Sequence, residues 1–394
     1  MNYKQSVYTI QLRYLKDDFE YIVNSFSGER EENIKNTKLN TCKSLFYDLH
    51  DVPLNISTHY LKKLEKYLRC IKKDIKKKGS DITFIMHLHN EKVLIDNRKE
   101  DNRSYGFLRL HFRDNDNNMH IDDIPILSSD PDDLEDRISY YSKKNASIRN
   151  LDNKEEDINF GFMPHILSPN ASGYFIHEIV GHTLEGDNYS YYKNKYENMN
   201  ISKKLTVIDS INGYDKLIGL QSYDDVGTKI KPLTLINKGK VQNILATQME
   251  DSFDHNLYGV ARRESYKFDV FPRMRGTYIQ PFDDMDQQNI LDKYKNAIFV
   301  NETFQGSVSP KTGDYSLMGN GFVVKNGELE NFIGDLRING NVLRDLSSIE
   351  YIGKDFDMFG RYCGKLGQNV RVGIGSPTIS ISSLNSRGRL YGKR

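Results

Sequence analysis

The chain has few cysteines, no tryptophan, almost no net charge and no long apolar run. Three cysteines among 394 residues are too few and too scattered for a disulfide framework, so a cysteine with a role would act as a thiolate. No stretch approaches the ~18 apolar residues that span a bilayer, and the start lacks a basic segment followed by an apolar run. These absences predict a soluble, cytoplasmic protein that does not enter a membrane.

The charges are balanced along the whole chain. There are 55 basic and 54 acidic residues, which gives a formal net charge of +1. Basic runs such as Lys76-Lys77-Lys78 are offset by acidic stretches such as Asp130 to Asp136. This composition offers no electrostatic case for nucleic acid as the main partner. With 38% hydrophobic residues, the chain has enough apolar side chains for a core and enough length for two domains.

Residues 1–155 are expected to form an N-terminal α/β domain. An apolar-periodic segment covers Leu15 to Phe26, and a better helix runs from Ser57, its N-cap, to about Lys77. Another helix starts at Asp130-Pro131. Strand-like runs cover residues 82–89 and 92–96, joined by a turn at Asn90-Glu91, and residues 105–112. The charged segment 150–157 marks the domain boundary.

Residues 156–394 are expected to form a β-rich domain, either an antiparallel sheet or barrel-like. A helix over about residues 169 to 183 opens it, because Ser168-Pro169 is a typical cap and first helical position. Lys238-Gly239 and Asn326-Gly327 resemble hairpin turns. The strand-like runs are residues 205–208, 233–236, 241–246, 297–300, 321–324, 370–374 and 378–381. The fold class is therefore α+β, with the helix carrying the motif described next.

Two histidines and a glutamate stand together in the segment from His177 to His182, which reads His-Glu-Ile-Val-Gly-His. In the common peptidase motif the histidines are four residues apart and share one helix face. Here they are five apart, and at ~100° per residue an ideal α-helix would hold them about 140° apart. One metal ion could reach both only if the helix widened locally, as in a π-bulge. Gly181 would tolerate such a distortion.

Zinc is the default metal for two imidazole ligands, although another divalent metal would fit the same motif. Three residues are candidates for the third ligand, and the spacing alone leaves them open: Glu185, Asp187 and Cys363. Glu178 would be the acid/base residue, taking a proton from the attacking water and returning it to the leaving amine. The simpler interpretation is a chance match with hydrogen-bonded core histidines and a buried apolar cysteine.

The segment from Leu167 to Asp187 closely resembles the metal-site segment of the TldD subunit of TldD/PmbA (TldE) peptidases. The similarity continues through several ordered motifs, which are far more specific than the metal motif by itself. They are Tyr223-Asp224-Asp225-Val226-Gly227, Pro272 to Ile279, Gly313-Asp314-Tyr315-Ser316, Cys363 to Gln368 and Val372 to Thr378.

The resemblance implies a metallopeptidase with one zinc ion in each metal-bearing subunit. Its metal ligands would be His177, His182 and Cys363, and Glu178 would be catalytic. The third-ligand question is thereby settled for Cys363. Glu185 and Asp187 would then shape the loop at the end of the helix or orient a ligand by hydrogen bonds.

The family acts on flexible or unfolded peptides, including precursors of peptide natural products and antitoxins. The resemblance thus implies a peptide substrate, with leader-peptide removal as one role. It also implies a dimer, either with a metal-free TldE-like homologue or with a second copy. The charge balance and the lack of a long apolar run, for their part, predict no nucleic-acid or membrane partner. Two alternatives stay open: a peptide-binding subunit with a structural metal, and metal-dependent modification of a peptide without cleavage.

Three further features of the sequence have simpler interpretations than a functional site. His87 and His89 would share one strand face, but no cysteine or convincing carboxylate accompanies them to complete a metal site. Gly373-Ile374-Gly375 lacks the third glycine and the strand-to-helix setting of a nucleotide-binding motif. Tyr278 is a candidate for a substrate-cleft or oxyanion role, although packing in a strand is the favoured interpretation.

Overall fold

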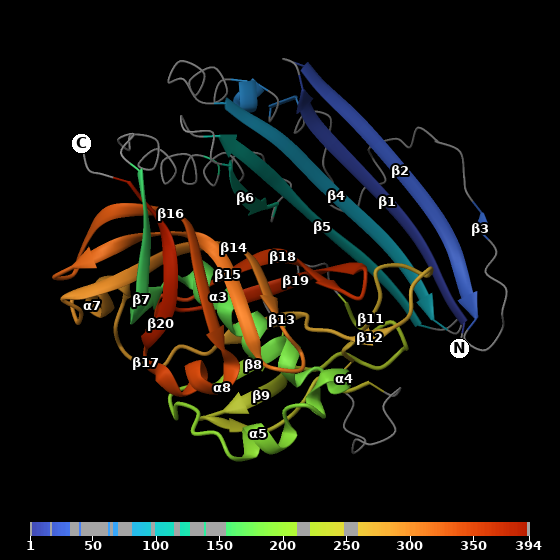
Figure 1. Cartoon of the computed structure of the whole chain (residues 1–394). Coiled ribbons are helices and arrows are strands. Elements are labelled where there is room, and N and C mark those ends of the chain that lie inside the picture. Colours follow the sequence, from blue (N-terminus) through green and yellow to red (C-terminus); the bar gives the residue numbers. More distant parts are fainter. Residues whose placement is uncertain are drawn as a thin grey trace.

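The computed structural model describes residues 2–15, 18–31, 39–40, 62–63, 66–69, 81–95, 99–113, 119–126, 138, 155–210, 221–247 and 259–391. These residues are β-rich and form three six-stranded sheets and one two-stranded sheet. Long strands of the first sheet lie along one side of the molecule, drawn in blue to teal (Figure 1). The other sheets and the helices that carry the histidine motif make up the rest.

The first sheet takes all its strands from the N-terminal third and is antiparallel throughout. Buried and half-buried side chains alternate along its fourth strand, as expected where one sheet face packs on a core. Its strand order is β3-β2-β1-β4-β5-β6. The strands are β1 (Asn2–Leu15), β2 (Asp18–Glu31), β3 (Leu39–Asn40), β4 (Asp81–Ile95), β5 (Lys99–Arg113) and β6 (Met119–Pro125).

Two expectations for this region are wrong. Most of the apolar-periodic segment from Leu15 to Phe26 lies in strand β2, which pairs residue by residue with β1. A short apolar segment is ambiguous by periodicity, and long-range pairing decides its conformation. Asn90-Glu91 is no turn either, because β4 continues through both residues with partners in β1 and β5. Of the helices expected from Ser57 and from Asp130, residues 62–63, 66–69 and 138 are helical, and the remainder lie outside the described residues.

The second half contains a closed barrel. Its strands pair in the order β16-β15-β14-β7-β20, and β20 pairs back onto β16. A short strand, β17 (Ile349–Ile352), adds to β20. The barrel strands are β7 (Glu155–Leu167), β14 (Asn296–Val308), β15 (Asp314–Lys325), β16 (Glu328–Asn341) and β20 (Ile379–Tyr391). This architecture agrees with the expectation of a β-rich, barrel-like second half.

The remaining six-stranded sheet has the order β10-β9-β8-β13-β19-β18, and β11 and β12 form the two-stranded sheet. Positive φ angles confirm the hairpin turns at Lys238-Gly239 and Asn326-Gly327. The strands are β8 (Val207–Asp209), β9 (Leu233–Asn237), β10 (Lys240–Val241), β11 (Ala261–Arg262), β12 (Phe271–Pro272), β13 (Gly276–Ile279), β18 (Asp357–Lys365) and β19 (Gln368–Ser376).

Helix α3 (Pro169–Ile176) lies between the barrel and this sheet (Figure 1). Apolar side chains of the helical segment, such as Phe175 and Ile179, share one core with Val300 of the barrel and Val372 of the sheet. In the described part of the chain no helix has both the length and the apolar character needed to cross a membrane. Further short α-helices among the described residues after 185 are α4 (Gly186–Tyr189), α5 (Lys193–Glu197), α7 (Gln287–Leu291) and α8 (Val342–Asp345).

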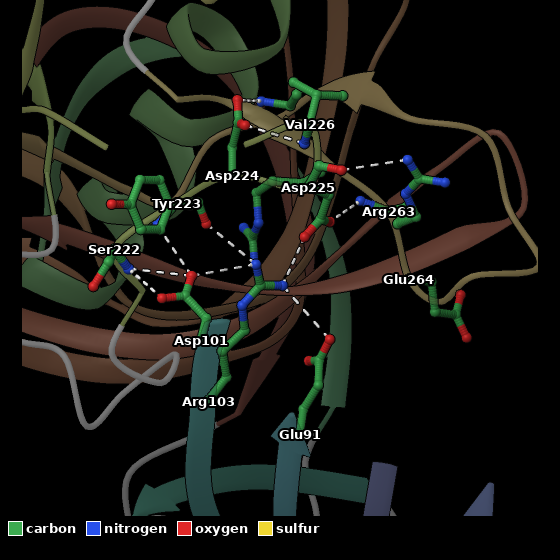
Figure 2. A network of polar contacts seen from close by, with 12 residues as sticks. Glu91, Asp101, Arg103, Ser222, Tyr223, Asp224, Asp225, Val226, Arg263 and Glu264 are labelled. Carbon is green, nitrogen blue, oxygen red and sulfur yellow. Dashed lines mark hydrogen bonds and ion pairs between the residues drawn. The ribbon is translucent and has the colours of Figure 1, made fainter. Parts of the chain in front are cut away.

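A buried polar network joins the first sheet to the second half (Figure 2). Arg103 of β5 donates to the Asp225 carboxylate at 2.7 Å, and both residues are buried. The neighbouring carboxylate of Asp101 accepts from the backbone N–H groups of Ser222 and Tyr223, each at 3.0 Å. Separating a buried ion pair would leave each charge without its partner, which is costly. The network therefore holds the first sheet and the second half of the chain in one arrangement.

His165 of β7 is fully buried inside the second half. Its Nδ1 lies 2.8 Å from the Met163 carbonyl oxygen, and its Nε2 lies 2.9 Å from Ser386 Oγ. The neutral ring satisfies both contacts when Nδ1–H donates to the carbonyl and Nε2 accepts from the hydroxyl. Burial lowers the pKa of His165 to about 4, so the ring is neutral in the folded protein.

Acidification should therefore destabilise the fold through His165. Between pH 6.5 and about 4 the unfolded chain binds a proton that the folded chain does not, so stability falls with falling pH, by about 3 kcal/mol in total. Urea unfolding of the wild type and of His165→Asn across this range tests it. The wild type should lose this much more stability than the variant, and identical pH slopes would contradict the assignment.

Candidate metal centre

The helical segment that carries the motif begins as the sequence predicts. Ser168 is the N-cap of α3, where its side chain accepts from the Ala171 N–H, and Pro169 occupies the first helical position. Ser172 Oγ donates to the Pro377 carbonyl at 2.8 Å, which ties the helix to the end of β19. A Cβ at Gly173 would lie 3.1 Å from the Gly375 backbone nitrogen, so helix and strand are closely packed.

The five residues from His177 to Gly181 form a π-helix, and His182 N–H donates to the His177 carbonyl. This i→i+5 hydrogen bond is the local widening that the histidine spacing predicts. It places the two imidazole rings 5.1 Å apart between centroids, with their planes nearly perpendicular. A short 3₁₀ turn from His182 to Leu184 then ends the helical segment.

The reason for a glycine at position 181 differs from the one expected. Its φ of −53° and ψ of −62° are ordinary helical values, so no special backbone freedom is needed there. A Cβ at Gly181 would instead collide with the sulfur of Met274, which is completely buried. Close packing, and not the distortion itself, therefore requires the glycine.

His177, His182 and Cys363 come together at the end of this helical segment. Their ligand atoms all lie within 4.8 Å of one another, and Cys363 Sγ is 3.3 Å from His182 Nε2. His177 Nδ1 is buried without a hydrogen-bond partner in the described structure. Two imidazoles and a thiolate are a ligand set that zinc accepts, so these residues fit a zinc ion.

Cys363 lies on β18, paired with Val370 of β19. The turn comes three residues later at Leu366-Gly367. Burial by itself would raise the pKa of the Cys363 thiol, but His182 and His177 hold it well below its usual value. The thiolate is the form that binds metal.

Glu185 lies on the other side of the His182 ring from Cys363. Its Oε2 is 3.0 Å from His182 Nδ1 and 2.9 Å from Lys365 Nζ, which also contacts Asp187 Oδ1 at 2.8 Å. Burial would raise the pKa of Glu185, but His182 and Lys365 lower it to about 2. The ionised carboxylate thus accepts the Nδ1 proton and leaves Nε2 directed at Cys363.

Lys365 was not identified from the sequence. It stands two residues after Cys363, and residues at this spacing share one face of a strand. This spacing is the one sign in the sequence that Lys365 lies near the candidate ligand Cys363. The carboxylates that Lys365 contacts lie about half the chain away, and no local sequence pattern links them to it.

Glu178 is 7% exposed and faces a cleft of about 490 Å³ whose lining includes the three candidate ligands His177, His182 and Cys363. Its side chain packs against Gly306 of β14, where a Cβ would lie 2.8 Å from Glu178 Cγ. Burial raises the pKa of Glu178, an effect that His182 and His177 partly oppose. The carboxyl group is therefore close to the histidines and shifted toward holding a proton.

The other sequence candidates lie apart from this centre. His87 stacks on Phe107 at 4.7 Å and His89 on Tyr105 at 4.6 Å, and the described residues hold no metal-binding group around them. Tyr278 packs edge-on against Phe356 and is not among the residues that line the cleft, which favours the packing interpretation.

Comparison with known proteins identifies the family. The family model of the PmbA/TldA metallopeptidase C-terminal domain matches residues 161–388, more than half of the chain. The chain belongs to the TldD/PmbA family. The resemblance seen in the motifs is therefore confirmed, and with it a role within a metallopeptidase family.

Curated TldD/PmbA relatives match more than half of the chain. A metalloprotease of Methanocaldococcus jannaschii is 32% identical over 242 residues, which cover 60% of this chain and 52% of the relative. A zinc metalloprotease TldD homologue of Saccharolobus solfataricus is 30% identical over 233 residues, or 58% and 52% of the two chains. The chain spans about half the length of the curated relatives it matches.

A solved structure of the family matches nearly the whole chain. TldE from Thermococcus kodakarensis aligns with a TM-score of 0.66 and 13% identity, covering 98% of this chain and 96% of that one. At this identity the likeness concerns the fold alone. The likeness in fold includes the first sheet, whereas the family motifs in the sequence all lie after that sheet.

The contact between Gly181 and Met274 can be tested by substitution. Gly181→Ala should lower the free energy of unfolding by about 1–3 kcal/mol, because the added methyl group overpacks a rigid core. Adding Met274→Ala should remove the collision, so the double variant should be more stable than the sum of the single effects. Strict additivity in urea unfolding would show that this contact does not require the glycine.

Proposed function

We propose that this chain is a zinc-dependent peptidase that hydrolyses peptide bonds in flexible or unfolded peptides. The observation that carries the proposal is the convergence of His177, His182 and Cys363 beside Glu178 at one cleft. Three protein ligands leave one position open, which is typical of catalytic zinc and not of structural zinc. A zinc ion bound there would polarise the substrate carbonyl and acidify water.

Glu178 is the residue that moves the proton. A carboxylate at the same cleft as His177, His182 and Cys363 can accept a proton from the attacking water at one oxygen and donate it to the leaving amine. Glu185 holds the His182 ring by its Nδ1 atom, and Lys365 keeps that carboxylate charged and in place. His182 therefore offers its Nε2 without having to reorient.

Unpaired strand edges beside the cleft suit an extended peptide. In the described structure β18 pairs only with β19, and β14 beyond Val300 pairs only with β15. Residues 304–308 of β14 and 361–365 of β18 line the cleft. A peptide added as a strand to either edge would pair with backbone that no second strand of the described structure uses, and would bring its own carbonyls beside Glu178.

The substrate and partner follow the family. Leader-peptide removal from a modified precursor is the proposed role, and a dimer with a TldE-like homologue or with a second copy is the proposed assembly. Because the chain carries the complete ligand set, it takes the metal-bearing position in such a dimer. Mass analysis of an incubated precursor peptide separates hydrolysis, which adds water across a bond, from modification without cleavage.

Replacing the proton carrier should abolish turnover without removing the metal. Glu178→Gln keeps the size of the side chain but cannot accept the proton, so kcat should fall by about 10²–10⁴. Zinc content by elemental analysis should stay at the wild-type value. Glu328→Gln, on an exposed position of β16, is the matched control. Full peptidase activity in Glu178→Gln would rule out this mechanism.

Replacing the thiolate should remove the metal. Cys363→Ser conserves the shape but weakens the bond to zinc, so the purified variant should bind zinc at least about tenfold more weakly than wild type. Competition with a chromophoric chelator measures this affinity. Cys42→Ser and Cys70→Ser are the thiol controls and should bind zinc as the wild type does. Unchanged affinity in Cys363→Ser would exclude Cys363 as a ligand.

A further inference from the structure

Exposed apolar side chains gather at the rim of the cleft. In the described part of the chain seven large hydrophobic residues are exposed, and Phe304, Tyr362 and Leu366 line this cleft. Their exposed fractions are 36%, 39% and 69%. Apolar side chains clustered beside a recessed site, and not scattered singly over the surface, are typical of a binding surface.

Leu366 is the most exposed of them and has an unfavourable backbone conformation. It is the first residue of the two-residue turn between β18 and β19, and its φ is +49°. Asparagine, aspartate and glycine are preferred at this position, because the left-handed region disfavours a branched side chain. A leucine at this position is neither buried nor in a favourable backbone conformation, so it does not stabilise the fold. Its presence beside a cleft therefore indicates a function.

The charges near this turn point to an apolar ligand. Lys365, the neighbour of Leu366, already contacts Glu185 and Asp187, so its charge is compensated within the protein. Arg361 also lines the cleft, but it precedes Cys363 on the same strand, whereas Leu366 follows it. The Leu366 end of the strand therefore offers apolar surface without a spare charge for an acidic side chain.

The occupant that fits is an extended peptide. The two unpaired strand edges described above run beside the cleft, and the edge of β18 leads from Cys363 to the Leu366 turn. A peptide strand along that edge would pass the ligand set and the apolar rim in one binding mode. Its backbone would pair with β18 while a side chain near the scissile bond meets Leu366.

We propose that Leu366, with Phe304 of β14, which lines the same cleft, forms an apolar subsite that selects peptides with a bulky apolar side chain near the cleaved bond. The proposal rests on the proposed peptidase function for the cleavage itself. Selection between side chains is nevertheless a binding property, and binding can be measured without turnover. Substrate preference at this subsite thus follows from the leucine and not from the metal ligands.

The test uses two unstructured peptides that differ only in phenylalanine or alanine near the cleaved bond. With the zinc-loaded wild type, kcat/KM should be higher for the phenylalanine peptide, because an apolar pocket discriminates by side-chain size. In Leu366→Asn this ratio should fall about tenfold. The thermal midpoint should stay equal or rise, since Asn-Gly is the preferred sequence for this turn.

The matched control is Lys238→Asn, which makes the same Asn-Gly turn between β9 and β10. It should leave the ratio unchanged. A ratio that is equal in wild type and Leu366→Asn would overturn the proposal, as would an equal loss in Lys238→Asn.

A binding arm separates this proposal from the peptidase function. Fluorescein-labelled forms of both peptides are titrated against zinc-loaded Glu178→Gln, with and without Leu366→Asn. If the phenylalanine peptide binds more tightly and Leu366→Asn removes this preference, the subsite is supported, even when neither peptide is cleaved. Absence of cleavage would refute only the peptidase function. Equal affinities for the two peptides, or binding of neither, would overturn the subsite.

Discussion

The hydrogen bond from His182 N–H to the His177 carbonyl is the constraint on which the candidate metal centre depends. It adds one residue to a helical turn, and only then do two histidines five residues apart turn toward the same thiol. Such a turn is held by its surroundings. Met274 fills the space at Gly181, and α3 packs closely on the backbone of β19. The barrel and the second sheet therefore both contribute to one helical distortion.

The centre also depends on how buried charges are compensated around it. Cys363 and Glu185 are buried and Lys365 is partly buried, and each lies against a partner of complementary charge or hydrogen-bonding capacity. Arg273, fully buried, donates to the Cys363 carbonyl and thereby holds the strand that carries the thiol. Because an unpaired buried charge is costly, these contacts restrict the side chains to few arrangements. A site of this kind is pre-organised before any ligand arrives.

Buried polar contacts join the first sheet to the second half of the chain. Arg103 and Asp101 reach the segment from Ser222 to Asp225, and that segment carries one of the family motifs. The motif Tyr223 to Gly227 thus has a structural role away from the metal centre. Its carboxylates bind backbone N–H groups and the arginine of a neighbouring sheet, which explains acidic residues that take no part in the chemistry (Figure 2).

The sequence by itself determined the local features: the capped start at Ser168, the π-turn demanded by the histidine spacing, the two glycine hairpins and the family. These depend on interactions within a few residues or on ordered motifs, and both are legible along the chain. Only the tertiary structure decided that residues 18–31 form a strand, that Cys363 lies on β18, and that Lys365 meets Glu185. Strand pairing and ion pairs between distant segments depend on long-range geometry, and local periodicity does not encode it. The same holds for Gly181, because the methionine that leaves no room for a side chain there lies almost a hundred positions later in the chain.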